Sequence, residues 1–404
     1  MPERPKKIVL AYSGGLDTST VLKWLQEEYQ AEVIAFIGDL GQPGDIAEAA
    51  AKAERIGAAK VVVRDLRERF VTGFAFPCLM AGALYQGRYP MASSIGRPLL
   101  AQEMLAIAEE EGADAVAHGC SGKGNDQLRF ALAAAAIRPD LTMMQPLLDW
   151  PLHNREEQVA WARERGIEVP VSADATYSYD ESVWGRSIGC GPIEDLGVAL
   201  PEEVFTWTRS PQQAPDTPQR VRIGFEQGRP VSLDDDKADP VELAVRLNEL
   251  AGRHGVGRIE HIEDKVVGIK SREIYETPAA VVLHRAHQDL EELTLDQETR
   301  EFKAGVAQRY ARLAYAGYWF SPLRRSLAAF VEDTQRFVTG EVEVELYKGS
   351  CRIVARRSDY ALYDYALSTY DSQDTFDHEA GRGFTRIATL PDRIAAKIRR
   401  TPVA

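Results

Sequence analysis

The chain has 404 residues, of which 45% are hydrophobic and 27% are charged, a balance that allows two or more domains with substantial cores. Its 48 Lys and Arg residues against 61 Asp and Glu residues give a net charge of −13, which disfavours nucleic acid as a substrate because such binding neutralises phosphates. No apolar run approaches ~18 residues and a polar N-terminus leads straight into the first strand, so we expect no membrane span and no signal peptide.

The chain opens with an apolar run over 8–11 and a helical pattern over 16–29, joined by a tight turn with two adjacent glycines. Glycine lets the backbone approach a ligand without a Cβ in the way. The unpaired N–H groups of the first helical turn point at such a ligand, and Ser13, Thr18 and Ser19 add hydroxyl donors. The turn therefore predicts an anion site, and a phosphate chain fits it best.

A phosphate chain needs more than the helix terminus, which contributes only about 0.3–1 kcal/mol per charge near a surface. We expect Mg²⁺ to assist, because this ion prefers phosphate oxygens plus a carboxylate or two, and Asp17 is the candidate helper. No Gly-Lys-Ser/Thr follows, so the turn is not a Walker A loop. The alternative is an ordinary helix cap built from the Ser, Asp and Thr of the turn.

Strand and helix patterns alternate through the first 170 residues. After the opening unit we predict strands over 32–39, 60–64, 113–118 and 142–147, with helices over 46–56, 98–111, 127–137 and 156–165. Such alternation indicates an α/β fold with a parallel sheet covered on both faces, whose ligands bind beyond the carboxyl ends of the strands. That rule places the 13–19 loop, the 38–42 turn and the loop after His118 on one rim.

The pattern changes after Pro170, and residues 173–190 are polar and aromatic with little periodicity. A basic amphipathic helix over 390–400 is either a solvated tail or an arm that docks on another subunit. Between these segments we predict hairpins from 221–225 with 231–233 and from 341–347 with 351–356, helices over 240–251 and 278–312, and a strand over 266–270. These elements indicate an α+β second domain.

A second glycine-rich turn follows the strand that ends at His118 and precedes a helix. Asn125 and Asp126 stand at the start of that helix, where each either caps the helix or binds a polar ligand. Lys123 and Arg129 flank them, so the turn offers charges of both signs to a zwitterionic ligand.

Cysteine spacing argues against a metal site and against a disulfide framework. Cys78, Cys120, Cys190 and Cys351 lie far apart, without a CxxC pair or a histidine at metal-binding spacing. They indicate reduced thiols and a cytoplasmic location.

The segment Ala11–Ser19 resembles the pyrophosphate loop, Ser-Gly-Gly-x-Asp-Ser/Thr-Ser, of ATP pyrophosphatases, which cleave ATP between its α and β phosphates. Together with 118–129, it is similar to the argininosuccinate synthase family. Further blocks carry the same resemblance over nearly the whole chain: 88–99, 177–187, 257–278, 350–352 and 362–364. The resemblance implies a Rossmann-like, adenine nucleotide α-hydrolase-like sheet over 1–170, an α+β synthetase domain over 171–365 and a C-terminal helical oligomerisation arm over 366–404.

The resemblance also implies a reaction. Members of this family join citrulline and aspartate into argininosuccinate, a step of arginine biosynthesis and the urea cycle, and convert ATP to AMP and pyrophosphate. Adenylation turns the ureido oxygen of citrulline into a good leaving group, and the α-amine of aspartate then attacks the ureido carbon. Such catalysis depends on positioning and charge stabilisation, for which Asp17, Asn125 and Asp126 are the candidates. The sequence accordingly shows no dedicated Ser-His-Asp or Cys-His constellation.

Substrate contacts follow from the resemblance residue by residue, and so does an expected homotetramer whose other partners are the small-molecule substrates. ATP would contact Ala11, Tyr12, Ser13, Gly14, Gly15, Leu16, Asp17, Thr18, Ser19, Gly38 and Gly119, with Mg²⁺ carried mainly by its phosphates. Citrulline would contact Tyr89, Ser94, Asn125, Arg129, Ser178, Ser187, Glu263 and Tyr275. Aspartate would contact Ser121, Asn125 and Asp126.

The chain departs from the family pattern at a few positions. Cys120-Ser121 replaces the usual Ala-Thr, and the retained hydroxyl should preserve aspartate binding. Gly38 stands where Ala is usual, which should loosen packing near the nucleotide. Gly189 stands where Glu is usual, and the resemblance places no ligand contact there.

Two other functions stay open. A different pyrophosphate-loop synthetase would adenylate another amide or ureido compound, although a glutamine-fed member needs a glutaminase domain and a tRNA-thiolating member usually has paired cysteines and a basic surface. A nucleotide-binding module without turnover would not need a pyrophosphate cradle.

Overall fold

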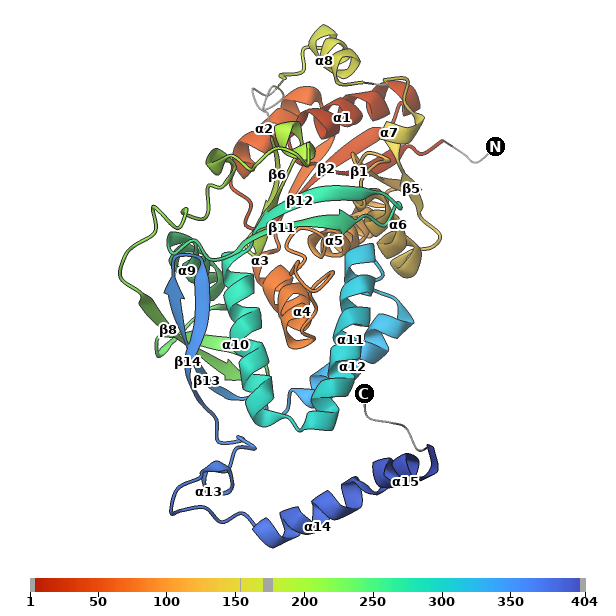
Figure 1. Cartoon of the computed structure of the whole chain (residues 1–404). Coiled ribbons are helices and arrows are strands. Elements are labelled where there is room, and N and C mark those ends of the chain that lie inside the picture. The colour runs from red at the N-terminus through yellow and green to blue at the C-terminus, as the bar shows by residue number, and fades with distance from the viewer. Residues whose placement is uncertain (1–3, 153, 170–176, 400–404) are drawn as a thin grey trace. The chain divides into compact units, whose positions relative to one another are not determined.

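The computed structural model describes residues 4–152, 154–169 and 177–399. Contacts between residues divide the chain into two compact units, Met1–Tyr360 and Ala361–Ala404. Figure 1 shows the elements of both units along the chain. The predicted boundary between residues 170 and 171 lies outside the described residues, as do 173–176 of the aperiodic segment.

The predicted parallel sheet is confirmed. Its strands are β1 (Lys7–Ala11), β2 (Glu32–Asp39), β3 (Lys60–Asp65), β4 (Ala115–His118) and β5 (Thr142–Met144), in the order β3-β2-β1-β4-β5 with parallel pairing throughout. The strand predicted over 142–147 ends early because Pro146 begins a short helix, α7 (Pro146–Asp149), and proline cannot donate to a strand ladder.

Helices cover both faces of this sheet. The predicted helices are present as α1 (Leu16–Tyr29), α2 (Ile46–Ile56), α5 (Gly96–Glu111), α6 (Asp126–Ile137) and α8 (Arg155–Glu164). A helical segment that the pattern did not predict precedes α5, as α3 (Arg67–Phe70), η1 (Val71–Ala75) and α4 (Phe76–Met80). Along β1, Ile8 and Leu10 join the core that includes α1, whereas Val9 joins the core that includes α5. Alternate side chains thus point to opposite covered faces.

Strand β1 lies between β2 and β4, so the order of the strands reverses beside it. Ala11 at the end of β1 pairs with His118 at the end of β4. The turn after β1 and the glycine-rich turn after β4 therefore begin side by side, as predicted. In open α/β sheets such a reversal is where ligands bind.

The second half contains an antiparallel sheet that confirms both predicted hairpins. Its strands, in spatial order, are β10 (Asp236–Lys237), β9 (Arg229–Leu233), β8 (Gln219–Glu226), β13 (Gly340–Tyr347) and β14 (Ser350–Arg357). The helices of this half are α9 (Pro240–Arg253), α10 (Pro278–Thr294), α11 (Gln297–Ala316) and α12 (Pro322–Thr334). The helical pattern predicted over 278–312 is confirmed as two helices, because Asp296 accepts from the N–H of Thr299 and so caps a new helix, α11.

A third sheet is antiparallel, and the sequence pattern missed it. Its order is β11 (Arg258–Asp264), β12 (Lys270–Glu276), β7 (Gly185–Gly189) and β6 (Ser178–Ser182). Strands β6 and β7 form a hairpin within the segment interpreted as aperiodic. The strand predicted over 266–270 is wrong: apart from Lys270 it is the turn between β11 and β12, closed by a 2.8 Å hydrogen bond from the N–H of Lys265 to the carbonyl of Ile269.

One face of the third sheet is closed by a buried ion pair. Arg186 Nε lies 2.7 Å from Oε2 of Glu276, whose side chain is fully buried. The carboxylate also accepts the N–H groups of Trp207 and Thr208 at 3.1 and 2.7 Å. A buried carboxylate satisfied in this way fixes the third sheet on the face that carries Arg186 and Glu276.

The unit Ala361–Ala404 contains α13 (Tyr365–Ser368), α14 (His378–Ala388) and α15 (Leu390–Arg399), which confirms the predicted C-terminal helix. None of these three helices has a buried residue, and Phe384 and Ile398 are 73% and 77% exposed. No helix in the described part of the chain is long and apolar enough to cross a membrane.

Candidate active site

The turn after β1 is shaped by Gly14, whose φ of +78° lies in the left-handed region that favours glycine. A Cβ on Gly14 would lie 3.0 Å from Cβ of Ala49, so α2 packs directly behind the turn. Hydrogen bonds between hydroxyl groups join the turn to α1. Ser13 Oγ lies 3.2 Å from Thr18 Oγ1, and Tyr12 Oη lies 3.0 Å from Ser19 Oγ.

No side chain caps α1, because its cap residue is Gly15 and no side chain accepts from its first turn. By contrast, Asp45 at the start of α2 accepts the N–H of Glu48. Asp17 is directed to α8 instead, where its Oδ1 accepts from Gln158 Nε2 at 2.8 Å. The helix-cap alternative is therefore wrong for this turn, and within the described residues the first-turn N–H groups of α1 are available to an anion.

Lys52 on α2 also belongs to this turn, although the sequence did not single it out. Its Nζ donates to the carbonyl of Gly14 at 3.0 Å, and the residue is only 8% exposed. Burial lowers the pKa of Lys52. Lys52 follows Ala49 by three residues, a spacing that puts both on one face of the helix. This spacing indicates a contact with the turn only once Ala49 is known to face the turn.

The two glycine-rich turns touch each other. A Cβ on Gly119 would lie 2.9 Å from Cγ2 of Thr18, so only glycine allows this approach. Gly38 was expected to loosen the packing, and that expectation is wrong. A Cβ on Gly38 would lie 2.3 Å from Cδ2 of Leu100, so the Leu100 side chain already fills this space. Ser121 is exposed in the turn after β4.

Asp126 joins the helices of the parallel sheet to the third sheet through a charge network. Its carboxylate accepts from Arg97 Nε at 3.0 Å and from Arg129 Nη1 at 2.7 Å, and Arg97 Nη2 lies 2.5 Å from Asp180 Oδ2 on β6. Burial alone would raise the pKa of Asp126, but the two guanidinium groups bring it to about 2. Burial raises the pKa of Asp180. Neither Arg97 nor Asp180 was predicted as a site residue.

The predicted citrulline contacts in the second half share one face of the third sheet. Ser187 on β7 pairs with Tyr275 on β12 and with Asp180 on β6. Residues directly opposite one another in an antiparallel pair point to the same face, and alternate residues along a strand do too. By this register Ser178 shares the face of Asp180, and Glu263, which pairs with Ser271, shares the face of Tyr275.

Glu263, near the end of the edge strand β11, is 2% exposed. Tyr275 Oη donates to its Oε2 at 2.5 Å, and Tyr315 Oη donates to its Oε1. The ring of Tyr275 stacks on Tyr89, with 3.7 Å between centroids. Burial raises the pKa of Tyr275 and of Tyr315, and the Glu263 charge raises both further, so each hydroxyl keeps its proton and donates. Burial also raises the pKa of Tyr89 to about 12.

Asn125 connects the glycine-rich turn to this carboxylate. Its Nδ2 donates to Tyr315 Oη at 2.7 Å, and its Oδ1 accepts the N–H of Val266 at 2.8 Å. No side chain caps α6, so the capping alternative is wrong for Asn125 and Asp126. The unpredicted Tyr315 thus touches three predicted contacts, Glu263, Asn125 and Arg129.

Two further positions are Ser94, a predicted citrulline contact, and Gly189, a departure from the family pattern. Ser94 is buried, and its Oγ donates to the carbonyl of Met91 at 3.4 Å. Gly189 has no atom within 4 Å of the place where a Cβ would stand, so the missing glutamate leaves no packing defect.

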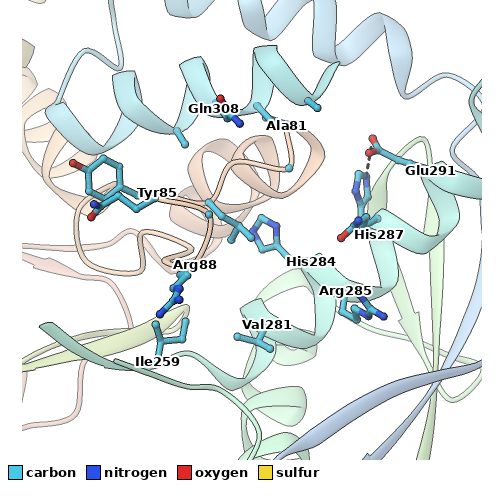
Figure 2. Close-up of a pocket in the computed structure, with 18 of the residues that line it drawn as sticks. Ala81, Tyr85, Arg88, Ile259, Val281, His284, Arg285, His287, Glu291 and Gln308 are labelled. Carbon is cyan, nitrogen blue, oxygen red and sulfur yellow. Dashed lines mark ion pairs between the residues drawn. The ribbon is translucent and has the colours of Figure 1, made fainter. Parts of the chain in front are cut away.

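A cavity of about 1350 Å³ lies among the 81–88 segment, the start of β11, α10 and α11, and none of the predicted substrate contacts lines it (Figure 2). Figure 2 shows the ring of His284 pointing into it. Tyr85 lines the cavity and stacks on Tyr315, with 3.5 Å between ring centroids. The cavity therefore borders the candidate site through Tyr85.

Within the described residues, no group of three His, Cys, Asp or Glu side chains could hold a metal ion by itself. Asp17, whose side chain is 46% exposed beside the turn, could still add one ligand to a cation held by phosphates. The arrangement thus offers amide donors for an anion on one side and charges of both signs for zwitterions on the other.

Comparisons with known proteins agree over nearly the whole chain. The family described as "Arginosuccinate synthase N-terminal HUP domain" matches residues 7–168, and "Arginosuccinate synthase C-terminal domain" matches 177–395. A protein of Symbiobacterium thermophilum named argininosuccinate synthase is 49% identical over 98% of this chain and 99% of its own length. Proteins of the same name from Rubrobacter xylanophilus and Geobacillus kaustophilus are 50% and 48% identical, over 98% and 96% of this chain and 97% and 95% of their own lengths.

Proposed function

The chain belongs to the argininosuccinate synthase family, and from this membership we propose how its residues hold the three substrates. The protein is an ATP-dependent ligase that condenses citrulline and aspartate in arginine biosynthesis. The observation that carries the proposal is the uncapped start of α1 next to Gly119, at the point where the strand order reverses.

ATP binds with its phosphates at this point. The first-turn N–H groups of α1 and the hydroxyls of Ser13 and Thr18 donate to them, and Lys52 holds the carbonyl of Gly14 away from the anion. Mg²⁺ bound to the phosphates offsets their charge, with Asp17 as the candidate protein ligand. Ala11, Tyr12, Gly38 and Gly119 border the nucleotide as backbone and packing contacts.

Citrulline binds on the polar face of the third sheet. Glu263, with its two tyrosine donors, is the anionic group for the substrate ammonium, and Arg129 is a cation for the substrate carboxylate. Ser178 and Ser187 offer hydroxyls from the same face, and Tyr89 stacked on Tyr275 forms a wall. Ser94 and Asn125 complete the set.

The chemistry proceeds in two displacements. The ureido oxygen of citrulline attacks the α-phosphorus, the bond to the bridging oxygen breaks, and pyrophosphate leaves with that electron pair. The α-amine of aspartate then attacks the ureido carbon, AMP leaves with the former ureido oxygen, and the amine loses a proton. The protein orients these atoms and stabilises the departing charges, which are large contributions to catalysis.

Aspartate binds at the start of α6. Ser121 and Asn125 offer polar contacts, and Asp126, held ionised by Arg97 and Arg129, accepts from the substrate amine. This places the nucleophilic nitrogen beside the citrulline site, because Asn125 belongs to both sets.

We also propose a cytoplasmic homotetramer. The four cysteines are free, which supports a reducing compartment. The helices α14 and α15 expose apolar residues such as Phe384 and Ile398 and bury none, which supports a role in subunit contacts.

Pyrophosphate release tests the order of these steps. Purified protein with Mg-ATP should release pyrophosphate only when citrulline is present, and should form AMP and argininosuccinate once aspartate is added. Release driven by another amide or ureido compound, with none from citrulline, would overturn the substrate assignment.

A further inference from the structure

Tyr315 near the C-terminal end of α11 is 1% exposed and touches residues that the proposed function assigns to different substrates. Its hydroxyl donates to Glu263, a citrulline contact, and accepts from Nδ2 of Asn125, a contact of both citrulline and aspartate. Its carbonyl accepts from Nε of Arg129 at 2.8 Å. Arg129 in turn holds Asp126, an aspartate contact, so Tyr315 lies between the two sets.

The side chain of Tyr315 is held in one position from two sides. Its ring is parallel to that of Tyr85, with 3.5 Å between centroids, and Arg129 Cζ lies 4.8 Å from its ring centroid. Gly317, which ends α11, lets the backbone approach α6, because a Cβ there would lie 2.7 Å from Cα of Arg129. The ring is therefore fixed, so the O–H of Tyr315 can turn only about its Cζ–Oη bond, beside Glu263 and Asn125.

We propose that Tyr315 is a positioning residue that couples citrulline binding to aspartate binding, an inference that rests on the proposed function. The hydroxyl can donate once, and it donates to Glu263 while accepting from Asn125. When citrulline engages Glu263, the orientation of the hydroxyl and hence of Asn125 is set for aspartate. By linkage, aspartate increases the affinity for citrulline by the same factor.

The test compares Tyr315→Phe with Tyr310→Phe. Tyr310 lies on the same helix, is also 1% exposed, and its hydroxyl contacts Arg324 at 3.3 Å instead of a substrate contact. Citrulline affinity is measured by calorimetry with a non-hydrolysable ATP analogue, with and without saturating aspartate. In the unsubstituted protein and in Tyr310→Phe, aspartate should increase the affinity for citrulline by about 5-fold or more. In Tyr315→Phe this factor should fall towards 1, and citrulline should bind about 10-fold more weakly.

A coupling factor that survives in Tyr315→Phe, that is lost equally in Tyr310→Phe, or that is absent from the unsubstituted protein would overturn the inference. Asn125→Ala separates this failure from that of the proposed function. If Asn125→Ala leaves citrulline and aspartate affinities unchanged, the assigned sites themselves are wrong. If Asn125→Ala weakens both ligands while Tyr315→Phe behaves like Tyr310→Phe, only the coupling role fails.

Discussion

The ammonium of Lys52 and the carbonyl of Gly14 lie 3.0 Å apart, which joins α2 to the turn that follows β1. The bond engages this carbonyl behind the turn and leaves the first-turn amides of α1 for the proposed phosphate site. It also brings a buried positive charge to the back of the turn that we propose holds the triphosphate.

Lys52→Met should therefore weaken the binding of ATP more than the binding of citrulline and aspartate. Loss of a charge-assisted hydrogen bond costs about 1.5–3 kcal/mol, so KM for ATP should rise by about 10-fold or more while KM for citrulline stays within about 2-fold. Steady-state kinetics with each substrate varied in turn measures both. Lys23→Met, which removes a half-buried lysine of α1 that pairs with Glu27, is the control. An equal rise in all three KM values would contradict the role of Lys52 at the phosphates.

Gly14→Ala tests the shape of the turn. A side chain in the left-handed region costs about 1–2 kcal/mol, and the new Cβ would also press on Ala49 at 3.0 Å. We expect KM for ATP to rise at least about 10-fold, with a small loss of thermal stability. Gly112→Ala, with a φ of +62° and no atom within 4 Å of the new Cβ, should lose similar stability and keep full ATP affinity. Equal ATP affinity in both variants would argue against a phosphate site here.

The elements around this turn could be predicted because their signals are local. Apolar runs define the strands, and glycines at left-handed positions end α2 and α5 at Gly57 and Gly112. The glycine motif predicted an anion site at the turn. It could not predict Lys52, because the contact of Lys52 with Gly14 exists only once α2 packs against the turn.

The third sheet could not be predicted from such signals. Strand β6 reads Ser-Tyr-Asp-Glu-Ser, without apolar alternation, because both of its faces make polar contacts. The apolar run at 266–269 looked like a strand, yet Gly268 adopts a φ of +89° in a turn. Tyr315 was missed for a related reason, since only the tertiary fold brings it to Asn125.

Stability should depend on pH through buried neutral histidines. Burial lowers the pKa of His284 from 6.5 to about 3, and Nε2 of His284 has no hydrogen-bond partner among the described residues. Because the unfolded chain then binds the proton more readily, His284 costs stability as pH falls below about 6.5, by up to ~1.4 kcal/mol per pH unit. His284→Leu should be neutral or stabilising at pH 7.5 and should reduce the loss between pH 7 and pH 5.

Urea denaturation at several pH values measures this effect, with His378→Gln, an exposed position, as the control. Burial also lowers the pKa of His118, to about 4. The free energy of unfolding of the His284 variant should therefore still fall somewhat as the pH falls. An unchanged slope in His284→Leu would show that this side chain titrates normally.

Removal of residues 361–404 tests the proposed tetramer. The unit Met1–Tyr360 has its own cores, so the shortened chain should keep its circular dichroism spectrum and melt cooperatively. Light scattering should report a smaller assembly than for the full chain. The full chain with Phe384→Ser and Ile398→Ser should also assemble less well, because both side chains are exposed and apolar. A shortened chain that keeps the mass of the full assembly would contradict a role for this unit.

The fate of one oxygen atom tests the central claim most directly. If the ureido oxygen of citrulline attacks the α-phosphorus, turnover of citrulline labelled there with oxygen-18 should release AMP that carries the label and pyrophosphate that does not. Mass spectrometry of the two products distinguishes the routes in a single reaction. Unlabelled AMP, or label in pyrophosphate, would contradict activation of citrulline as its adenylate at this site.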